Sequence, residues 1–367
     1  MKIRAAVLHE VGQPLIIEEL ELDPPGQGEV LVQMKAAGLC HSDLSTMTGV
    51  RPRPRPMAIG HEAAGVVAEL GPGVSDLAVG DHVVTTFTPN CGHCTPCRSG
   101  RPALCEPAFA ANSAGTLLGG GRRLHLNGKD VHHQVGVSSF AEHAVMNTSS
   151  LVPVDKDLPL DEAALFGCAI ITGVGAVINT ARVPLGASVA VVGLGGVGLA
   201  ALLGAKLAGA RRLVAIDLRD DKLALARQLG ASDTFSAADE GCAEAVREAT
   251  GGGVEYAIEI AGSTPALELA WAITARGGTT VTAGLPHYED RAAISPVQLV
   301  GEERTLKGSY AGSCVPARDI PHFVELYRQG KLPVDRLLSE RLTLDQVNQG
   351  FDRLAAGDMV RQMVMFD

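Results

Sequence analysis

The hexapeptide GLGGVG at positions 193–198 restricts the fold of this chain more than any other stretch. It follows the apolar run SVAVVG and opens a helical stretch rich in small residues. In such a strand–turn–helix unit Gly193 permits a tight turn, Gly195 lets the backbone approach a pyrophosphate, and Gly198 allows close packing of helix on sheet. Because a helix N-terminus also offers partial positive charge and free N–H groups, the unit predicts a dinucleotide site. The alternative is a glycine-rich turn that binds nothing.

Apolar strands and helical stretches alternate around this unit, from about residue 184 to about residue 310. The predicted strands are 188–193, 211–217, 254–262 and 277–284, and the predicted helices are 196–210 and 220–231. This alternation is typical of βαβ units on a doubly wound parallel sheet. The first 150 residues are instead rich in short β-type runs (29–38, 63–71, 81–87), and two amphipathic helices and a closing strand follow residue 311. We therefore expect an α/β protein in which the cofactor domain is inserted into a β-rich domain.

Asp217 ends the second of these strands, nineteen residues after Gly198. A carboxylate at this point accepts hydrogen bonds from the adenosine ribose hydroxyls and repels a 2′-phosphate, which favours NAD over NADP. Arg219 weakens this preference if it faces the coenzyme, and is otherwise a solvated arginine at the start of a helix. The sequence therefore predicts a site for NAD.

Four of the eight cysteines lie in the stretch CGHCTPCRSGRPALC, in the pattern C-x2-C-x2-C-x7-C. These cysteines are Cys91, Cys94, Cys97 and Cys105. Four thiolates from one lobe form a closed tetrahedral set of the kind that holds structural zinc. An iron–sulfur centre is the first alternative. Disulfides are the second, and they would need an oxidising compartment that the sequence does not indicate.

A second set of soft ligands is dispersed along the chain. Cys40, His61 and Cys168 each lie beside a glycine-rich turn, in GLCHSDLS, GHEAAG and FGCAIITG. Two thiolates and one imidazole leave a fourth position for water or substrate, which is the open pattern of catalytic zinc. Taken singly, each residue also has an ordinary interpretation as a buried thiol or a structural histidine.

The charge and hydropathy of the chain exclude several functions. Its formal net charge of −10 argues against nucleic acid or an anionic membrane as the main partner. No apolar run reaches membrane length, and the N-terminus lacks the apolar core and cleavage site of a signal peptide. We therefore expect a cytoplasmic protein whose clustered cysteines are reduced and bind metal.

These motifs, in this order and relative spacing, resemble the zinc-dependent medium-chain alcohol dehydrogenases over nearly the whole chain. The stretch 115–143 is similar to the longer members, which include the animal and class III enzymes. The resemblance implies a GroES-like catalytic domain (1–169 and 311–367) with the zinc lobe 91–105, and an inserted Rossmann domain, 170–310. It implies two Zn²⁺ per chain, a catalytic one on Cys40, His61 and Cys168 and a structural one on the lobe cysteines. It also implies reversible hydride transfer between an alcohol and NAD. Cys242 and Cys314 match no ligand position.

The resemblance also implies roles for residues near the catalytic zinc. Asp43 would hydrogen-bond His61, and Glu62 would lie just behind the metal. Ser42 matches the hydroxyl that takes the alcohol proton and passes it to the nicotinamide ribose. Where many members end this relay with a histidine, the chain has Ser45. Serine is not a base near neutral pH, so we expect the relay to end in water or in another group.

Coenzyme and substrate contacts follow from the resemblance in the same way. His41 and Arg361 match positions that face the pyrophosphate, and Thr172 and Val197 match positions against the nicotinamide ring. The full set of candidate coenzyme-binding residues is His41, Thr172, Gly193, Gly195, Gly196, Val197, Gly198, Asp217, Arg219, Lys222 and Arg361. The candidates for the substrate pocket are Phe87, Phe109 and Leu117.

The substrate is the least constrained feature. Class III members hold the carboxylate of S-(hydroxymethyl)glutathione with an arginine just past the last lobe cysteine, where this chain has Phe109. The basic run RPRPRP (51–56) replaces another acid-binding residue of that class. Its alternating prolines hold the backbone extended. The run is either a solvated loop or a segment that attracts anionic substrates or coenzyme. We expect a medium-sized or aromatic primary alcohol, with S-(hydroxymethyl)glutathione as the alternative. A non-catalytic NAD-binding structural protein is an alternative of another class.

By analogy with the family we expect a homodimer, or else a tetramer, that pairs through the edge of the cofactor-domain sheet.

Overall fold

The computed structural model describes residues 1–367, and the chain divides into two compact units. Unit 1 comprises Met1–Cys168, Val315–Glu325 and Val334–Asp367, and unit 2 comprises Ala169–Cys314 and Leu326–Pro333. These boundaries differ slightly from the expected ones, because the chain returns to unit 1 at Val315 and not at residue 311. A contact within unit 2 explains the difference: the Cys314 thiol donates a hydrogen bond to the Ile171 carbonyl at 3.1 Å.

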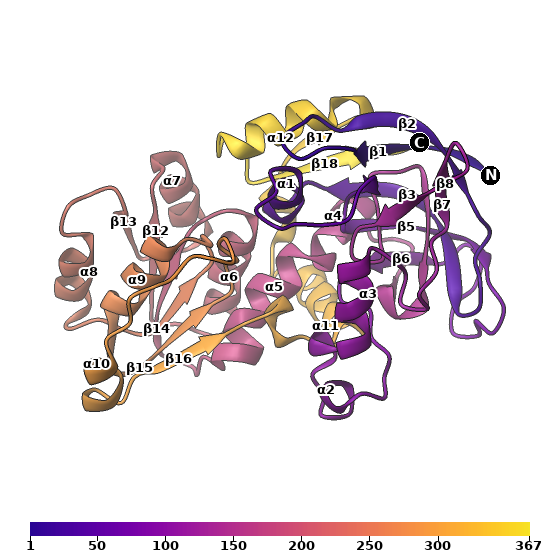
Figure 1. The fold of residues 1–367 in the computed structure, drawn as a ribbon. Coiled ribbons are helices and arrows are strands. Elements are labelled where there is room, and N and C mark those ends of the chain that lie inside the picture. Colours follow the sequence, from indigo (N-terminus) through magenta and orange to yellow (C-terminus); the bar gives the residue numbers. More distant parts are fainter. The chain divides into compact units, whose positions relative to one another are not determined.

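Unit 2 contains a six-stranded parallel sheet in the order β13-β12-β11-β14-β15-β16 (Figure 1). Its strands are β11 (Ser188–Val192), β12 (Arg212–Asp217), β13 (Asp233–Ser236), β14 (Val254–Glu259), β15 (Thr274–Thr282) and β16 (Thr305–Gly308). Its helices are α5 (Ala169–Gly175), α6 (Gly196–Leu207), α7 (Asp220–Leu229), α8 (Cys242–Thr250), α9 (Thr264–Ile273) and α10 (Pro296–Gly301), with the short turns η4 (Ala176–Ala181) and η5 (Ala311–Ser313). This strand order is that of the doubly wound dinucleotide-binding fold, so the expected fold class is confirmed for this unit.

The glycine motif lies at the carboxyl end of β11, where the strand order of this sheet reverses. All five residues of β11 are buried, which explains why the sequence is continuously apolar there and does not alternate. Ligands of open α/β sheets bind at such reversal points. The topology therefore places the predicted dinucleotide site where this fold binds its ligands.

Unit 1 is built from a closed barrel and a larger sheet. The barrel strands are β1 (Lys2–Leu8), β2 (Ile16–Leu22), β7 (Leu124–Leu126), β8 (Lys129–His133) and β4 (Met57–Ala58). The sheet strands are β10 (Leu151–Val154), β6 (His82–Thr85), β5 (Glu62–Leu70), β3 (Glu29–Gly38), β18 (Arg361–Met365) and β17 (Leu338–Leu342), with β9 (His143–Asn147) pairing with β3. Because β18 pairs with β3, the C-terminal segment (yellow) completes the sheet of the N-terminal segment (indigo) (Figure 1). This return confirms the inserted arrangement.

Helices and short turns connect the strands of unit 1. They are α1 (His41–Met47), α2 (Thr95–Arg98), η1 (Pro102–Leu104), α3 (Glu106–Ala114), η2 (Thr148–Ser150), α4 (Leu160–Ala164), η3 (Leu165–Gly167), η6 (Val334–Leu337), η7 (Leu344–Gln346) and α12 (Val347–Ala355). Helix α11 (Pro316–Arg328) begins in unit 1 and ends in unit 2. The bent pair 160–167 and 169–181 has the combined length and composition of a membrane span, but no single helix does.

We expect His133, at the end of β8, to make the stability of the barrel sensitive to acid. Its side chain is fully buried, and its Nε2 accepts a hydrogen bond from the Arg123 backbone N–H at 3.1 Å. Burial, and then the neighbouring Arg122 and Arg123, lower the pKa of His133 to about 3. The unfolded chain, with an ordinary pKa near 6.5, therefore binds the proton first as pH falls. The contribution of His133 to stability is complete above about pH 6.5 and is lost progressively toward pH 3.

We expect His133→Gln, which keeps a hydrogen-bond acceptor, to remove this part of the acid sensitivity. Between pH 7.5 and pH 5.0 the wild-type protein should lose about 2 kcal/mol more unfolding free energy than the variant, since that is the linkage expected of such a shift. Urea unfolding at the two pH values measures the difference. Equal losses in both proteins would contradict the assignment.

Candidate functional site

Three potential metal ligands converge inside unit 1. The Sγ atoms of Cys40 and Cys168 and a ring nitrogen of His61 all lie within 4.8 Å of one another, and all three side chains are buried. The Cys168 Sγ is 3.4 Å from the His61 Nε2. Cys40 precedes α1, His61 precedes β5, and Cys168 follows η3, so three distant segments supply the set.

Two glycines allow these segments to meet. Gly60 has φ +106°, and a Cβ there would lie 2.6 Å from the Phe140 backbone nitrogen, so only glycine fits the turn that presents His61. At Gly167 a Cβ would collide with the Thr85 carbonyl oxygen. Because Gly167 has no side chain, η3 lies against β6, and Cys168 comes close to His61.

Asp43 fixes both α1 and His61 with a single buried carboxylate. Its Oδ2 accepts the Cys40 backbone N–H at 3.2 Å, and its Oδ1 lies 2.7 Å from the His61 Nδ1. The Nδ1 proton is thereby directed to Asp43, and the Nε2 is directed to the cysteines. This carboxylate–histidine arrangement is the one that orients metal-ligating histidines.

The pKa values of the site follow from its hydrogen bonds and from its burial. The hydrogen bond from Cys168 lowers the pKa of the Cys40 thiol well below its usual range, and the same bond raises the pKa of Cys168. Burial raises the pKa of Glu62 to about 7, and the Arg361 guanidinium opposes this rise. The Arg361 Nη2 is 3.2 Å from Glu62 Oε2, and its Nη1 donates to the Leu39 carbonyl at 2.8 Å. A buried ion pair therefore lies beside the ligand set.

The donor set fits zinc. Zn–S and Zn–N bonds of roughly 2.3 and 2.0 Å place tetrahedral donor atoms about 3.5 Å apart, close to the 3.4 Å between the Cys168 Sγ and the His61 Nε2. Two soft thiolates and one neutral imidazole are the ligands that zinc prefers, and three protein ligands leave a fourth position for substrate.

The lobe at 91–105 forms a second, closed set. The Sγ atoms of all four lobe cysteines lie within 4.8 Å of one another. Cys94 caps α2 and Cys105 caps α3, and the backbone N–H groups of Cys91 and Cys94 donate to Sγ atoms of the lobe at 3.3 Å. The His93 backbone N–H lowers the pKa of Cys91 to about 6, whereas burial raises that of Cys97 to about 12. A four-thiolate lobe fixed by short turns fits structural zinc.

The glycine motif in unit 2 has the three predicted properties. Gly193 has φ +91°, and a Cβ on it would lie 2.7 Å from the Ala261 nitrogen. A Cβ on Gly195 would meet nothing within 4 Å, so the backbone faces open space at the N-terminus of α6. A Cβ on Gly198 would collide with the Gly193 carbonyl oxygen. The open space beside Gly195 fits an incoming pyrophosphate.

Asp217 is held beside the same turn. Its Oδ2 accepts the Leu194 N–H at 2.6 Å, and its Oδ1 accepts the Arg219 N–H at 3.1 Å. The Arg219 side chain donates to Asp221 at 3.1 Å, and Lys222 is buried in the first turn of α7. The carboxylate is therefore positioned by the turn that forms the phosphate cradle.

Comparison with known proteins identifies the family. Residues 26–156 match the alcohol dehydrogenase GroES-like domain, and residues 196–329 match the zinc-binding dehydrogenase domain. An S-(hydroxymethyl)glutathione dehydrogenase from Paracoccus denitrificans is 36% identical over 378 residues, which cover all of both chains. This chain belongs to the zinc-dependent medium-chain alcohol dehydrogenases.

Solved structures of other dehydrogenases extend this similarity to the whole fold. A zinc-binding-domain alcohol dehydrogenase from Burkholderia ambifaria is 37% identical with a TM-score of 0.96, covering 100% of this chain and 99% of that one. A benzyl alcohol dehydrogenase from Acinetobacter calcoaceticus is 35% identical with a TM-score of 0.95, covering both chains completely. The chain is therefore an oxidoreductase, and its cysteine–histidine sets and its glycine motif fit zinc and a nicotinamide dinucleotide.

The remaining coenzyme candidates of this alcohol dehydrogenase lie in both units. In unit 2, α5 packs on α6 so closely that a Cβ on Gly173 would collide with the Val197 carbonyl oxygen, which brings Thr172 and Val197 into neighbouring helices. The Thr172 Oγ1 is buried and has no hydrogen-bond partner. In unit 1, His41 is exposed at the start of α1, whereas Arg361 is 3% exposed.

The three substrate-pocket candidates separate into two groups. The Phe87 ring meets the His61 ring edge-on, with centroids 5.6 Å apart, and the Phe87 carbonyl accepts the Asn112 side-chain N–H at 3.5 Å. Phe109 is 76% exposed on α3, the helix that carries Asn112. Leu117 is fully buried in the hydrophobic core of the barrel. The structure therefore places Phe87 beside the metal ligand His61 and joins Phe87 to α3, and it does not place Leu117 with them.

The sequence did not indicate the roles of two residues that support the backbone around His61. The Gln134 side chain accepts the Gly60 N–H at 2.5 Å, and the Thr85 hydroxyl accepts the Ala63 N–H at 3.0 Å. Both hold the backbone on either side of His61. Gln134 is 74 residues from its partner, so local pattern did not indicate its role.

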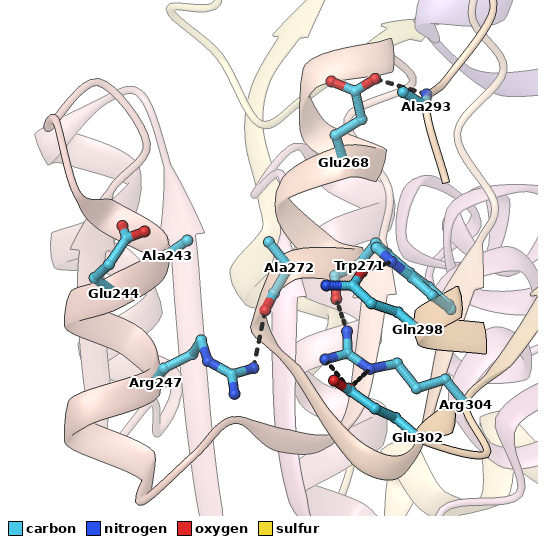
Figure 2. Close-up of a pocket in the computed structure, with 10 residues that line it drawn as sticks. All are labelled: Ala243, Glu244, Arg247, Glu268, Trp271, Ala272, Ala293, Gln298, Glu302 and Arg304. Carbon is cyan, nitrogen blue, oxygen red and sulfur yellow. Dashed lines mark hydrogen bonds and ion pairs between the residues drawn. The ribbon is translucent and has the colours of Figure 1, made fainter. Parts of the chain in front are cut away.

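A hollow of about 540 Å³ in unit 2 lies apart from the glycine motif, between α8, α9 and α10 (Figure 2). Most of its charged groups bind the protein itself: Arg304 binds Glu302 and the Trp271 carbonyl, Arg247 donates to the Ala272 carbonyl, and Glu268 accepts the Ala293 N–H. The Arg304 guanidinium also lies over the Trp271 ring, 5.2 Å from its centroid. These contacts stabilise the helix packing and leave little to bind a ligand.

Proposed function

We propose that this chain interconverts a primary alcohol, medium-sized or aromatic, and its aldehyde by hydride transfer to or from NAD. The observation that carries the proposal is the buried set of Cys40, His61 and Cys168, with Asp43 fixing His61. Zinc, when bound there, supplies Lewis acidity toward the substrate oxygen, and NAD, when bound at the glycine motif, accepts the hydride.

Residues of unit 1 prepare this reaction. Asp43 holds the Nδ1–H of His61 and so keeps the Nε2 available as a ligand. Ser42, half-buried at the start of α1, takes the proton of the substrate hydroxyl. Ser45 cannot store that proton as a histidine would, so water carries it away. The Glu62–Arg361 pair adjusts the charge behind the thiolates.

The preference for an aromatic or medium-sized alcohol has two supports. The Phe87 ring offers apolar surface beside His61, and Phe109 is exposed on α3, the helix that is joined to Phe87 through Asn112. A relative that covers the whole chain is a benzyl alcohol dehydrogenase. The name of the Paracoccus denitrificans relative favours S-(hydroxymethyl)glutathione as a second candidate, but Phe109 cannot bind a carboxylate as arginine does.

The first experiment is zinc content per chain, with NADH formation over a panel of alcohols that includes benzyl alcohol and S-(hydroxymethyl)glutathione. We expect two zincs and turnover of benzyl alcohol. Turnover of the glutathione adduct alone would replace the proposed substrate with the second candidate. One zinc without turnover of any alcohol would point to a non-catalytic coenzyme-binding protein.

Asp217→Asn should weaken the preference for NAD over NADP. The amide keeps an acceptor for the Leu194 N–H but loses the charge that repels a 2′-phosphate. Hydrogen bonds to charged groups contribute about 1.5–3 kcal/mol, so the ratio of kcat/KM for the two coenzymes should fall roughly 10- to 100-fold. The matched control is Asp220→Asn, an exposed carboxylate in the first turn of α7, which should leave the ratio unchanged. An unchanged ratio in the Asp217 variant would refute its assignment.

We also propose that the chain forms a homodimer through β16. This strand is the edge of the sheet, and Leu306 on it and Val297 and Val300 on α10 are exposed. Apolar exposed edges favour pairing with a second copy. Light scattering tests the dimer, and a monomeric wild-type protein at micromolar concentration would contradict it. We also propose that the protein is located in the cytoplasm, where thiols stay reduced and the clustered cysteines can bind metal.

A further inference from the structure

A buried carboxylate, that of Glu259, lies at the carboxyl end of the sheet in unit 2. Glu259 is the last residue of β14. It pairs with Val192, the last residue of β11, on one side, and with Thr282, the last residue of β15, on the other. The Glu259 side chain is 1% exposed. It is therefore placed where the turns that follow three neighbouring strands begin.

The Glu259 carboxylate joins the turns after β14 and β15. Its Oε1 accepts the Gly262 backbone N–H at 2.6 Å, and its Oε2 accepts the Thr282 hydroxyl at 2.6 Å. Burial raises the pKa of Glu259, and the hydrogen bonds from Thr282 and Gly262 oppose this rise. Because a buried charge is costly without such partners, the two turns and the carboxylate stabilise one another.

The turn after β14 also contacts the glycine motif. A Cβ on Gly284 would collide with the Gly262 nitrogen, so the turns after β14 and β15 meet through their backbones. Ala261, in the first of these turns, packs against Gly193, since its nitrogen would lie 2.7 Å from a Cβ there. Ala261 is exposed, whereas Glu259 is buried. A change at the carboxylate should therefore move exposed backbone beside the phosphate cradle.

The strand order indicates which half of the coenzyme these turns serve. Asp217, the candidate for binding the adenosine ribose, ends β12, and β12 and β14 lie on opposite sides of β11. A dinucleotide binds across the point where the strand order reverses, with one nucleotide over each half of the sheet. The turns after β14 and β15 are therefore on the side of the nicotinamide nucleotide.

The adenosine side of the motif is held by other contacts. The Gly193 N–H donates to the Ile216 carbonyl at 2.8 Å, and Asp217 accepts the Leu194 N–H at 2.6 Å. Neither hydrogen bond involves the turns after β14 and β15. Loss of the Glu259 carboxylate should leave this side in place.

We propose that Glu259 is a positioning residue for the nicotinamide half of the coenzyme. It acts through the backbone of the turns after β14 and β15, which it holds in one arrangement together with Thr282. This inference rests on the coenzyme site of the proposed function and adds a residue to it. A residue that only stabilised the fold would affect both halves of the coenzyme equally.

The test compares the binding of NADH with that of AMP, which contains only the adenosine half. Glu259→Gln keeps one acceptor but loses the charge, and it should raise the Kd for NADH roughly 10-fold and that for AMP by no more than about 2-fold. Fluorescence titration with NADH and calorimetric titration with AMP measure these constants on the zinc-loaded full chain. Unchanged AMP binding also shows that the variant is folded.

Variants of Thr282 test the same contact from β15. Thr282→Val removes the hydroxyl but keeps the shape of the side chain, and it should weaken NADH binding in the same way. Thr282→Ser keeps the hydroxyl and should retain wild-type binding. Because the two groups act as one contact, the double variant with Glu259→Gln should lose no more affinity than the larger single loss. Fully additive losses would contradict the shared role.

Glu255→Gln is the matched control. Glu255 is also a carboxylate of β14, and it also accepts a backbone N–H and a hydroxyl, both from Ser188, at 2.7 and 2.9 Å. It lies at the amino end of the strand, so its variant should alter neither Kd. Equal losses of NADH and AMP binding by the Glu259 variant would overturn the inference. An unchanged Kd for NADH in the Glu259 and Thr282→Val variants, or an equal effect of the Glu255 variant, would overturn it as well.

These binding measurements contain no alcohol, which separates the inference from the proposed function. A wild-type protein that binds NADH but oxidises no alcohol would contradict the proposed reaction, and the Kd values of the variants would still decide the role of Glu259. Alcohol turnover by a Glu259 variant with wild-type Kd for NADH would uphold the proposed function and overturn this inference.

Discussion

Replacing His61 with glutamine is expected to remove one of the two zincs per chain and to lower kcat/KM by at least about 10³-fold. The loss of the catalytic zinc takes away several kcal/mol of transition-state stabilisation. The remaining donors, Cys40 and Cys168, are two thiols that hydrogen-bond each other and cannot hold the metal in an open tetrahedral site. Metal analysis by mass spectrometry and steady-state kinetics with NAD measure both effects.

Two variants serve as controls for this result. Asp43→Asn keeps a hydrogen-bond partner for the His61 ring but removes its charge, and such changes around a metal ligand cost roughly 10- to 100-fold in affinity or activity. His82→Gln changes a half-buried histidine of β6 and should keep both zincs and full activity. Retention of two zincs and wild-type turnover by the His61 variant would remove His61 from the ligand set.

The glycine motif was predictable because all its determinants are contiguous in the chain. The strand before Gly193, the helix after Gly195 and the following strand that ends at Asp217 carry their own hydrophobic patterns, and β11, α6 and β12 begin and end within a few residues of the predicted bounds. The physical demands of a tight turn and of close packing select glycine at each position. For this reason the β11–α6–β12 unit could be predicted from one contiguous segment.

Other features depended on contacts that no local pattern encodes. Helices α8 and α9 were not predicted from the sequence; in α9 the stretch TPALELAWAI has no clear polar face to separate it from its neighbouring strands. Leu117 follows a glycine turn near the lobe, yet the barrel closes around it. Asn112 and Gln134 act through partners 25 and 74 residues away. Such roles are fixed by the tertiary fold and emerge only once the strands are paired.

Replacing Cys97 with serine should remove the other zinc and mainly reduce stability. The lobe has little apolar core of its own: none of the residues of α2 is buried, and the cysteines are its common point of contact. Structural zinc contributes about 10–16 kcal/mol to isolated zinc-finger peptides, and a lobe anchored at both ends to a folded domain should lose only part of this. A loss of about 3–4 kcal/mol would lower Tm by roughly 10 °C in a domain of this size. Differential scanning calorimetry and metal analysis measure these changes.

The effect of Cys97→Ser on catalysis follows from where the lobe ends. Cys105 caps α3, and α3 carries Phe109 and Asn112, whose carbonyl holds Arg53. We therefore expect the variant to keep its catalytic zinc and much of its kcat but to show a higher KM, because α3, whose Asn112 side chain donates to the Phe87 carbonyl, loses its anchor. Ser99→Ala, a non-ligand of the same lobe, should retain both zincs and the wild-type Tm. A Cys97 variant with two zincs and an unchanged Tm would show that the four thiols are not a metal site. A variant that lost the catalytic zinc as well would show that the lobe and the catalytic ligand set fold as one unit.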